Sequence, residues 1–171
     1  MGGIGEPAER VLVLEFWATW CPPCRDSIPH LTQVQAQYQR QKKNVVIVGI
    51  TNEAESTVRP FVTKMDKKME YVVALDQTSE TNALKNGLQV RGIPHAVIVD
   101  KTNTIVFSGH PMDQEFEREL EKAAGNLAQA KPAKITLSRE ELQALSIGAL
   151  KSTLRKKNFF FSGRVFNLVP M

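Results

Sequence analysis

The chain has 171 residues, of which 42% are hydrophobic and 23% are charged, a balance typical of a soluble globular protein. No segment reaches the roughly 18 consecutive apolar residues that a membrane span needs, which argues against a membrane protein. The net charge of +4 is unevenly distributed, because residues 127–171 hold eight Lys/Arg against two Asp/Glu, whereas residues 1–126 hold 14 against 16. The basic character therefore belongs to the C-terminal tail.

The first half of the chain alternates short apolar runs with segments of helical periodicity. We predict, in chain order, a strand at 11–16, a helix at 21–41 that bends at Pro29, a strand at 45–50, a helix at 53–69, a short strand at 71–75 and a helix at 79–87 with Gly87 as its C-cap. The β-branched run at 45–50 is typical of a strand that is buried on both faces.

The order of elements continues with a turn and strand at 90–100, which forms a hairpin with a strand at 104–109, and an amphipathic helix at 112–125. Alternating strands and helices followed by a hairpin predict an α/β fold, with a mixed central sheet and helices on both faces.

The texture of the sequence changes after this helix. We expect one domain at residues 1–126, a small polar linker at 127–134 and a basic helical tail at 135–171. Ser138 and Glu141 form a capping box, and Ser146 can begin a second helix. The last residues, FFFSGRVFNLVPM, are apolar and aperiodic, and their role has no physical explanation from the sequence.

Cys21 and Cys24 are the only cysteines, and the segment WCPPC places them where a helix begins. A disulfide between them closes too short a loop to constrain the unfolded chain much, so a stabilising role is disfavoured. A helix N-terminus favours a thiolate through its unpaired N–H groups. We therefore expect the sulfur of Cys21 to be exposed and Cys24 to be more buried. Pro22 and Pro23 suit the first helical turn, which has no intrahelical use for their N–H groups.

The segment FWATWCPPCRDSIP resembles the active-site segment of the thioredoxin superfamily, in its TlpA-like (redoxin) branch. RGIPHAVIVDKTNTIVFSGHP resembles the second signature of that family, and the resemblance covers roughly residues 8–125. It implies a thioredoxin fold with a cis-proline at Pro94. It also implies that Ile93 offers backbone groups to a substrate chain, and we expect Trp20 to lie on the substrate-facing surface.

Three positions differ from the family pattern. Glu15 stands where thioredoxins keep a buried Asp that accepts the proton of the second cysteine, and the resemblance gives Glu15 that role. A buried carboxylate there would titrate at a raised pH. Ser27 replaces an acidic residue that is common in the TlpA-like branch, and the strand at 45–50 lacks the usual lysine partner of the acid. The chain also begins without the N-terminal hairpin typical of that branch.

Other interpretations of these residues stay open. The cysteines could be an inert remnant, or bind zinc with ligands from His30, His95 and His110, although no histidine pair has the usual spacing of a zinc site. Trp17 fits a core position. Arg25 and Asp26 fit a solvated helix face.

The favoured function is a thiol-disulfide oxidoreductase that reduces protein disulfides through Cys21 and Cys24, with no bound cofactor and with electrons from a separate reductase. The sequence MGGIGEPAER has no apolar run of the kind found in secretory signals, so we expect a cytoplasmic protein, and we expect a monomer. In such a reducing compartment, paired cysteines favour catalysis or metal binding over a structural disulfide. The alternative is a redox-inactive or weakly active thioredoxin-like scaffold that is recruited to a partner through its basic C-terminal tail. The tail resembles SAP-like modules, some of which bind DNA, but a protein-docking or solvated face is favoured over nucleic acid.

Overall fold

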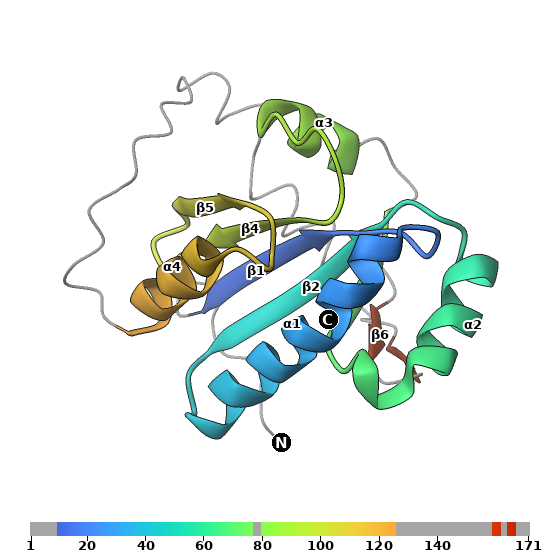
Figure 1. Ribbon diagram of the computed structural model, residues 1–171, viewed down its shortest axis with the longest axis horizontal. Coiled ribbons are helices and arrows are strands. Elements are labelled where there is room, and N and C mark those ends of the chain that lie inside the picture. The colour runs from blue at the N-terminus through green and yellow to red at the C-terminus, as the bar shows by residue number, and fades with distance from the viewer. Residues whose placement is uncertain (1–9, 77–79, 126–158, 162–163, 167–171) are drawn as a thin grey trace, which may run out of the picture.

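The computed structural model describes residues 10–76, 80–125, 159–161 and 164–166. A mixed β-sheet lies at the centre of these residues (Figure 1). The order of strands across the sheet is β5-β4-β1-β2-β3-β6-β7. In chain order the strands are β1 Val11–Phe16, β2 Val45–Thr51, β3 Val72–Leu75, β4 His95–Val99, β5 Ile105–Gly109, β6 Phe159–Phe161 and β7 Arg164–Phe166.

The central strand, β1, has neighbours of both orientations. It pairs in parallel with β2 and antiparallel with β4, while β3 continues the parallel half and β5 the antiparallel half. Within this register Glu15 lies between Gly49 on β2 and Ala96 on β4. The predicted mixed sheet is confirmed, and the end of β1 carries the chain directly to the cysteines.

Helices cover both faces of the sheet, as predicted. They are α1 Pro22–Arg40, α2 Glu55–Met65 followed by the short 3-10 helix η2 Asp66–Lys68, α3 Glu80–Gly87 and α4 Gln114–Gly125. Residues of α1, α2 and α4 pack in one apolar cluster with one face of the sheet, and Leu84 of α3 packs in a second cluster on the other face. In Figure 1, α3 stands apart from α1 and α4.

Side-chain alternation along β1 explains the two clusters. Val11 and Val13 point into the cluster with α1, whereas Leu14 and Phe16 belong to the cluster with α3. Glu15 shares the parity of Val11 and Val13 and is fully buried. The sheet therefore carries a carboxyl group into an apolar layer beneath α1.

The ends of the helices follow local hydrogen bonding. Lys42 takes up a left-handed conformation (φ 54°) after α1, where the N–H of Lys43 donates to the carbonyl of Tyr38. The prediction that Gly87 caps its helix is wrong: α3 includes Gly87, and the left-handed residue is Gln89 (φ 53°), with the N–H of Val90 donating to Lys85. The cap is therefore a Schellman motif two residues further on.

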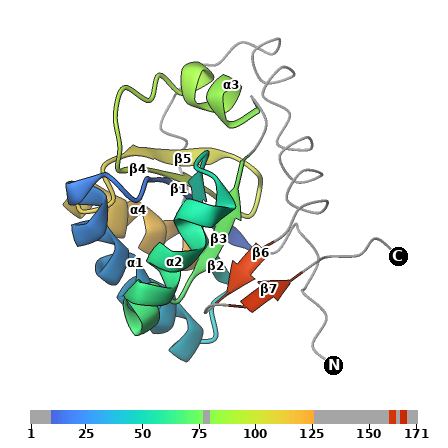
Figure 2. The same cartoon turned by 90° about the vertical axis from the view of Figure 1, so that its right-hand side faces the viewer.

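Part of the C-terminal region extends the sheet. β6 pairs antiparallel with β3, and β7 pairs antiparallel with β6, so that the two strands lie at that edge (Figure 2). The prediction of a helical tail over 135–171 is therefore wrong for residues 159–161 and 164–166, because the backbone of 159–161 pairs with the open edge of β3 and that of 164–166 pairs with β6. The linker and the helices predicted around Ser138 and Ser146 lie outside the described residues.

None of the helices in the described ranges is both long and apolar enough to cross a membrane.

Candidate active site

A disulfide bond joins Cys21 to Cys24 at the start of α1. Cys21 is the N-cap residue, and its Sγ accepts a hydrogen bond from the N–H of Cys24 at 3.3 Å. Pro22 and Pro23 fill the first two helical positions, where an N–H would have no intrahelical acceptor. The predicted placement of all four residues is confirmed. A thiolate on Cys21 would be stabilised by the same N–H group and by the helix dipole.

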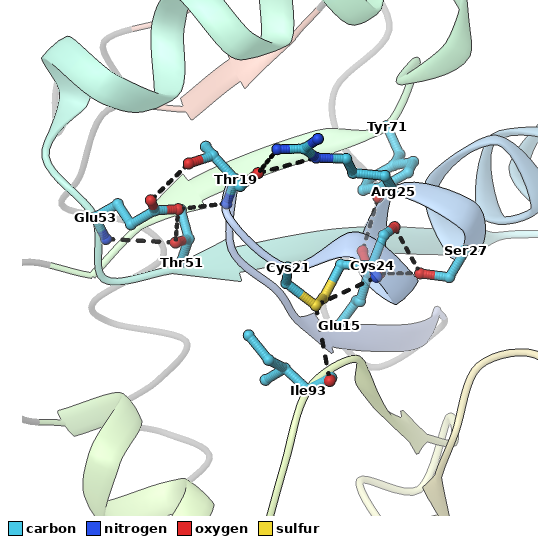
Figure 3. The surroundings of a disulfide bond; sticks show 10 residues. All are labelled: Glu15, Thr19, Cys21, Cys24, Arg25, Ser27, Thr51, Glu53, Tyr71 and Ile93. Atoms are coloured by element: carbon cyan, nitrogen blue, oxygen red, sulfur yellow. Dashed lines mark hydrogen bonds between the residues drawn. A yellow bond between two sulfur atoms is a disulfide. The ribbon is translucent and has the colours of Figure 1, made fainter.

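The predicted exposure of Cys21 is wrong. Only 2% of Cys21 is accessible to solvent, and Cys24 is fully buried. The carbonyl oxygen of Ile93 lies 3.7 Å from Cys21 Sγ, so the loop before β4 covers the sulfur (Figure 3). The Ile93–Pro94 peptide bond is cis, as the family resemblance implied. The sequence predicted that Cys21 lies at the start of a helix, but it did not predict that the Ile93 loop lies against the sulfur.

Glu15 is the buried carboxyl group on the Cys24 side of the site. Tyr71 Oη donates to Glu15 Oε2 at 2.7 Å, and Ser27 Oγ lies 3.1 Å from Oε1. Burial raises the pKa of Glu15 from 4.5 to about 7, and the two hydrogen bonds lower it only in part. Ser27 Oγ also lies 3.0 Å from the carbonyl oxygen of Cys24. A carboxyl group that titrates near neutrality thus contacts the helical turn of the second cysteine.

Tyr71 is a site residue that the sequence pattern did not predict. It precedes β3, 56 residues from Glu15, and replaces the absent lysine as the partner of the acid. Burial raises its own pKa well above 10, and the nearby Glu15 carboxylate raises it further, so the hydroxyl stays a donor. The one available signal was the buried glutamate itself, because such a group requires hydrogen-bond donors.

Gly49 allows the aromatic rings behind Glu15 to approach the sheet. A Cβ atom at this position would lie 2.9 Å from both Trp17 Nε1 and Tyr71 Cε2, closer than such atoms pack. Gly49 is also the β2 partner of Glu15. The glycine therefore makes room for the tyrosine that hydrogen-bonds the acid.

The two tryptophans have the different environments that we predicted. Trp17 is buried, with its ring 5.4 Å from that of Phe61, while Trp20 is 67% exposed beside Cys21. Arg25 and Asp26 are both exposed, as predicted for a solvated helix face, but Arg25 also makes local hydrogen bonds. Its Nε and Nη2 donate to the carbonyl oxygen of Thr19 at 3.1 and 2.8 Å.

The histidines that were considered as zinc ligands have other partners than the cysteines. His95 Nε2 is 2.9 Å from Ser108 Oγ, and burial, helped by His110, lowers its pKa. His30 faces Glu117 at 3.6 Å. Within the described residues, no three His, Cys, Asp or Glu side chains gather in a way that could hold a metal ion.

Comparisons with known proteins agree with this geometry. The sequence profile of a family described as thioredoxin-like matches residues 9–105. The thiol-disulfide oxidoreductase ResA of a Bacillus cereus strain is 29% identical over 112 residues, which cover 64% of this chain and 61% of ResA. The thioredoxin-like protein YneN of Bacillus subtilis is 29% identical over 116 residues, covering 66% of this chain and 64% of YneN.

A solved structure shares the fold. The thiol:disulfide interchange protein from Chlorobium tepidum TLS, a thioredoxin family protein, superposes with a TM-score of 0.56 at 27% identity, covering 70% of this chain and 83% of that protein. The chain spans about three-fifths of the length of the curated relatives that it matches. Since the family profile matches more than half of the residues, the chain belongs to the thioredoxin-like family.

Proposed function

We propose that the protein is a thiol-disulfide oxidoreductase that exchanges the disulfides of protein substrates through Cys21 and Cys24. The observation that carries the proposal is the Cys21–Cys24 disulfide at a helix N-terminus, with the N–H of Cys24 directed at Cys21 Sγ and the Ile93 carbonyl beside it. The names of the relatives, thiol-disulfide oxidoreductase and thiol:disulfide interchange protein, support the same reaction class.

The reduced protein would act in two displacement steps. The Cys21 thiolate attacks one sulfur of the substrate disulfide, and the other substrate sulfur leaves as a thiolate. Cys24, as a thiolate, then attacks Cys21 Sγ, which releases the second substrate thiolate and leaves the Cys21–Cys24 disulfide. Two electrons pass from the cysteine pair to the substrate, and a separate dithiol reductase returns them.

Glu15 would take the proton that Cys24 must lose before the second step, directly or through a water molecule. Its pKa of about 7 suits a group that accepts and returns a proton near neutral pH. Ser27 connects the Glu15 carboxyl to the Cys24 carbonyl. Proton uptake also removes the charge of the buried carboxylate, and burial favours that neutral form.

The substrate chain would lie between Trp20 and the Ile93–Pro94 loop. The Ile93 carbonyl already approaches Cys21 Sγ, and Trp20, the residue before Cys21, has an exposed indole that offers an apolar surface to a substrate. Cys21 is only 2% exposed in the disulfide state, and the Ile93 carbonyl lies beside its sulfur, so a substrate that reaches this sulfur would also contact the loop.

Net reduction is the direction we propose, in keeping with the predicted cytoplasmic location. A reduction potential below that of the glutathione pool, about −220 mV or lower, would support a reductant, and a potential near −120 mV would support an oxidant. Equilibration of the purified protein with glutathione buffers would measure it.

The test of the function is insulin-disulfide reduction by the wild type and by Cys21→Ser, with dithiothreitol as the electron source. We expect the wild type to accelerate the reaction and the variant to match the rate without protein. Equal rates for a folded wild type and the variant would refute the oxidoreductase function and favour the scaffold alternative.

A further inference from the structure

The backbone that leads into Trp20 and Cys21 is held at Thr19 by two side chains from different parts of the chain. Glu53 Oε2 accepts a hydrogen bond from the Thr19 N–H at 2.6 Å, and Glu53 Oε1 accepts one from Thr19 Oγ1 at 2.7 Å. On the other side, Arg25 donates twice to the Thr19 carbonyl oxygen. Figure 3 shows Thr19 between these two charged groups.

Glu53 is itself fixed by the end of β2. Thr51 Oγ1 donates to Glu53 Oε2 at 3.2 Å and accepts from the Glu53 N–H at 3.4 Å. Thr51 is buried, so its hydroxyl group gives the carboxylate a rigid support. The Thr19–Glu53 contact joins two loops that are 34 residues apart in sequence, and it anchors the Cys21 loop to the sheet.

Arg25 is held by a ring as well as by Thr19. Its guanidinium carbon lies 5.8 Å from the centre of the Phe61 ring on α2, and Phe61 packs against the buried Trp17. A planar guanidinium can donate from two of its nitrogen atoms to one carbonyl oxygen while lying over an aromatic ring, which a lysine cannot do. Arg25 therefore ties α1, α2 and the loop together.

Trp20 depends on this backbone because packing does little to place it. With 67% of its surface exposed, the indole receives little support from neighbouring side chains. The hydrogen-bonded backbone of Thr19, the residue before it, is the described support nearest to Trp20 in the chain. A rotation of that backbone would shift both Trp20 and Cys21.

We propose that Glu53 and Arg25 are positioning residues that clamp Thr19, so that Trp20 and Cys21 present one fixed surface to an extended protein substrate. The inference rests on the proposed function. Neither residue touches the reacting sulfurs, so the clamp governs docking of a chain rather than the chemistry of the thiolate. Substrates too small to contact Trp20 and the Ile93–Pro94 loop together do not need it.

The test compares two substrates in single-turnover oxidation of the pre-reduced protein. One is insulin, and the other is bis(hydroxyethyl) disulfide, which lacks a chain to dock. Free thiols are counted by alkylation and mass measurement after an acid quench. The variants are Glu53→Ala, Glu53→Gln, Arg25→Met and Arg25→Lys, and the control is Glu55→Gln, which alters a half-exposed acid on α2 that pairs with Arg59.

We expect Glu53→Ala and Arg25→Met to lower the second-order rate constant for insulin by about tenfold, and that for the small disulfide by less than about twofold. Glu53→Gln loses less, because its amide oxygen still accepts one hydrogen bond. Arg25→Lys keeps the charge but not the planar fork, so its loss approaches that of Arg25→Met. Glu55→Gln matches the wild type on both substrates.

An unchanged rate with insulin, or an equal loss on both substrates, would overturn the clamp. If Glu53→Ala does not fold, Glu53→Gln and Arg25→Lys decide the question. Cys21→Ser is run in parallel, because a wild type no faster than this variant would refute the proposed function rather than the clamp.

Discussion

The two sides of the Cys21–Cys24 disulfide differ in how they are built. On the Cys24 side, Glu15, Ser27 and Tyr71 are all buried, and both hydroxyl groups hydrogen-bond the carboxyl group. On the Cys21 side, a backbone carbonyl lies beside the sulfur, the residue that precedes Cys21 is an exposed tryptophan, and the proposed charged clamp holds the loop. The buried side can hold a proton and the open side can receive a chain, so each cysteine has surroundings suited to one of the two displacement steps.

The strongest test of this division removes the second cysteine. Without Cys24 the first step can proceed but the resolving step cannot, so Cys24→Ser should trap substrate on Cys21. We expect turnover of insulin to fall by at least about a hundredfold, with a mixed disulfide at Cys21. Mass measurement under non-reducing conditions detects it. A variant that turns over normally, or that is trapped through another group, would contradict the assigned order.

The buried side predicts a pH-dependent stability. The Glu15 carboxyl has a pKa of about 7 in the fold against 4.5 ordinarily, so the folded state binds its proton more tightly than the unfolded state. The stability that this difference provides is present below pH 4.5 and is lost as pH rises through 7. At about 1.4 kcal/mol per pH unit, the loss is about 3 kcal/mol.

Glu15→Gln removes this dependence while keeping the shape of the side chain. We expect the free energy of unfolding of the oxidised variant, relative to the wild type, to increase by about 3 kcal/mol between pH 4.5 and about pH 8. Urea denaturation across that range measures it. A difference that stays constant, or that shrinks as pH rises, would show that Glu15 is not a buried acid with a raised pKa.

Tyr71→Phe has a smaller effect on the same side. Loss of the hydroxyl removes a hydrogen bond that lowers the pKa of Glu15, so that pKa should rise further. We expect a loss of about 1–3 kcal/mol of unfolding free energy, larger at about pH 8 than at about pH 5 because the carboxylate is then charged and lacks its donor. Tyr38→Phe, on α1, is the matched control and should show no such pH trend.

The smallest effect on stability is expected on the Cys21 side, at the exposed Trp20. Trp20→Ala should change the free energy of unfolding by no more than about 0.5 kcal/mol, since the indole is mostly in solvent. Reduction of insulin should nevertheless slow by about threefold to tenfold, as for an aromatic residue at a binding surface. A large loss of stability would instead make Trp20 a structural residue, like Trp17.

Local patterns explain why much of the fold was predictable. The apolar runs at 11–16 and 45–50 and the Cys-Pro-Pro-Cys helix start are set by neighbouring residues, and the structure has β1, β2 and α1 there. The cis bond before Pro94 came from family resemblance, because nothing local favours it. The burial of Glu15 was predictable both from the local pattern, since it is an acid inside an apolar run, and from the family resemblance, since it stands where the family keeps a buried acid.

Contacts between distant segments could not be predicted in this way. Tyr71 reaches Glu15 only because β2 and β3 pair in parallel, and Glu53 reaches Thr19 only because two loops meet at the end of the sheet. The burial of Cys21 likewise depends on the Ile93–Pro94 loop. Each of these contacts follows from strand register, which the sequence pattern alone left open.

The most direct measurement of the division between the two sides is the pH dependence of alkylation of each cysteine in the reduced protein, resolved by peptide mass. Cys21 should react with iodoacetamide faster than Cys24 and at a lower pH. The N–H of Cys24 and the helix N-terminus stabilise the Cys21 thiolate, whereas Cys24 lies fully buried on the Glu15 side. If Cys24 reacts first, or if both cysteines react equally only above about pH 8.5 as unperturbed thiols do, the assignment of Cys21 as the attacking residue is contradicted.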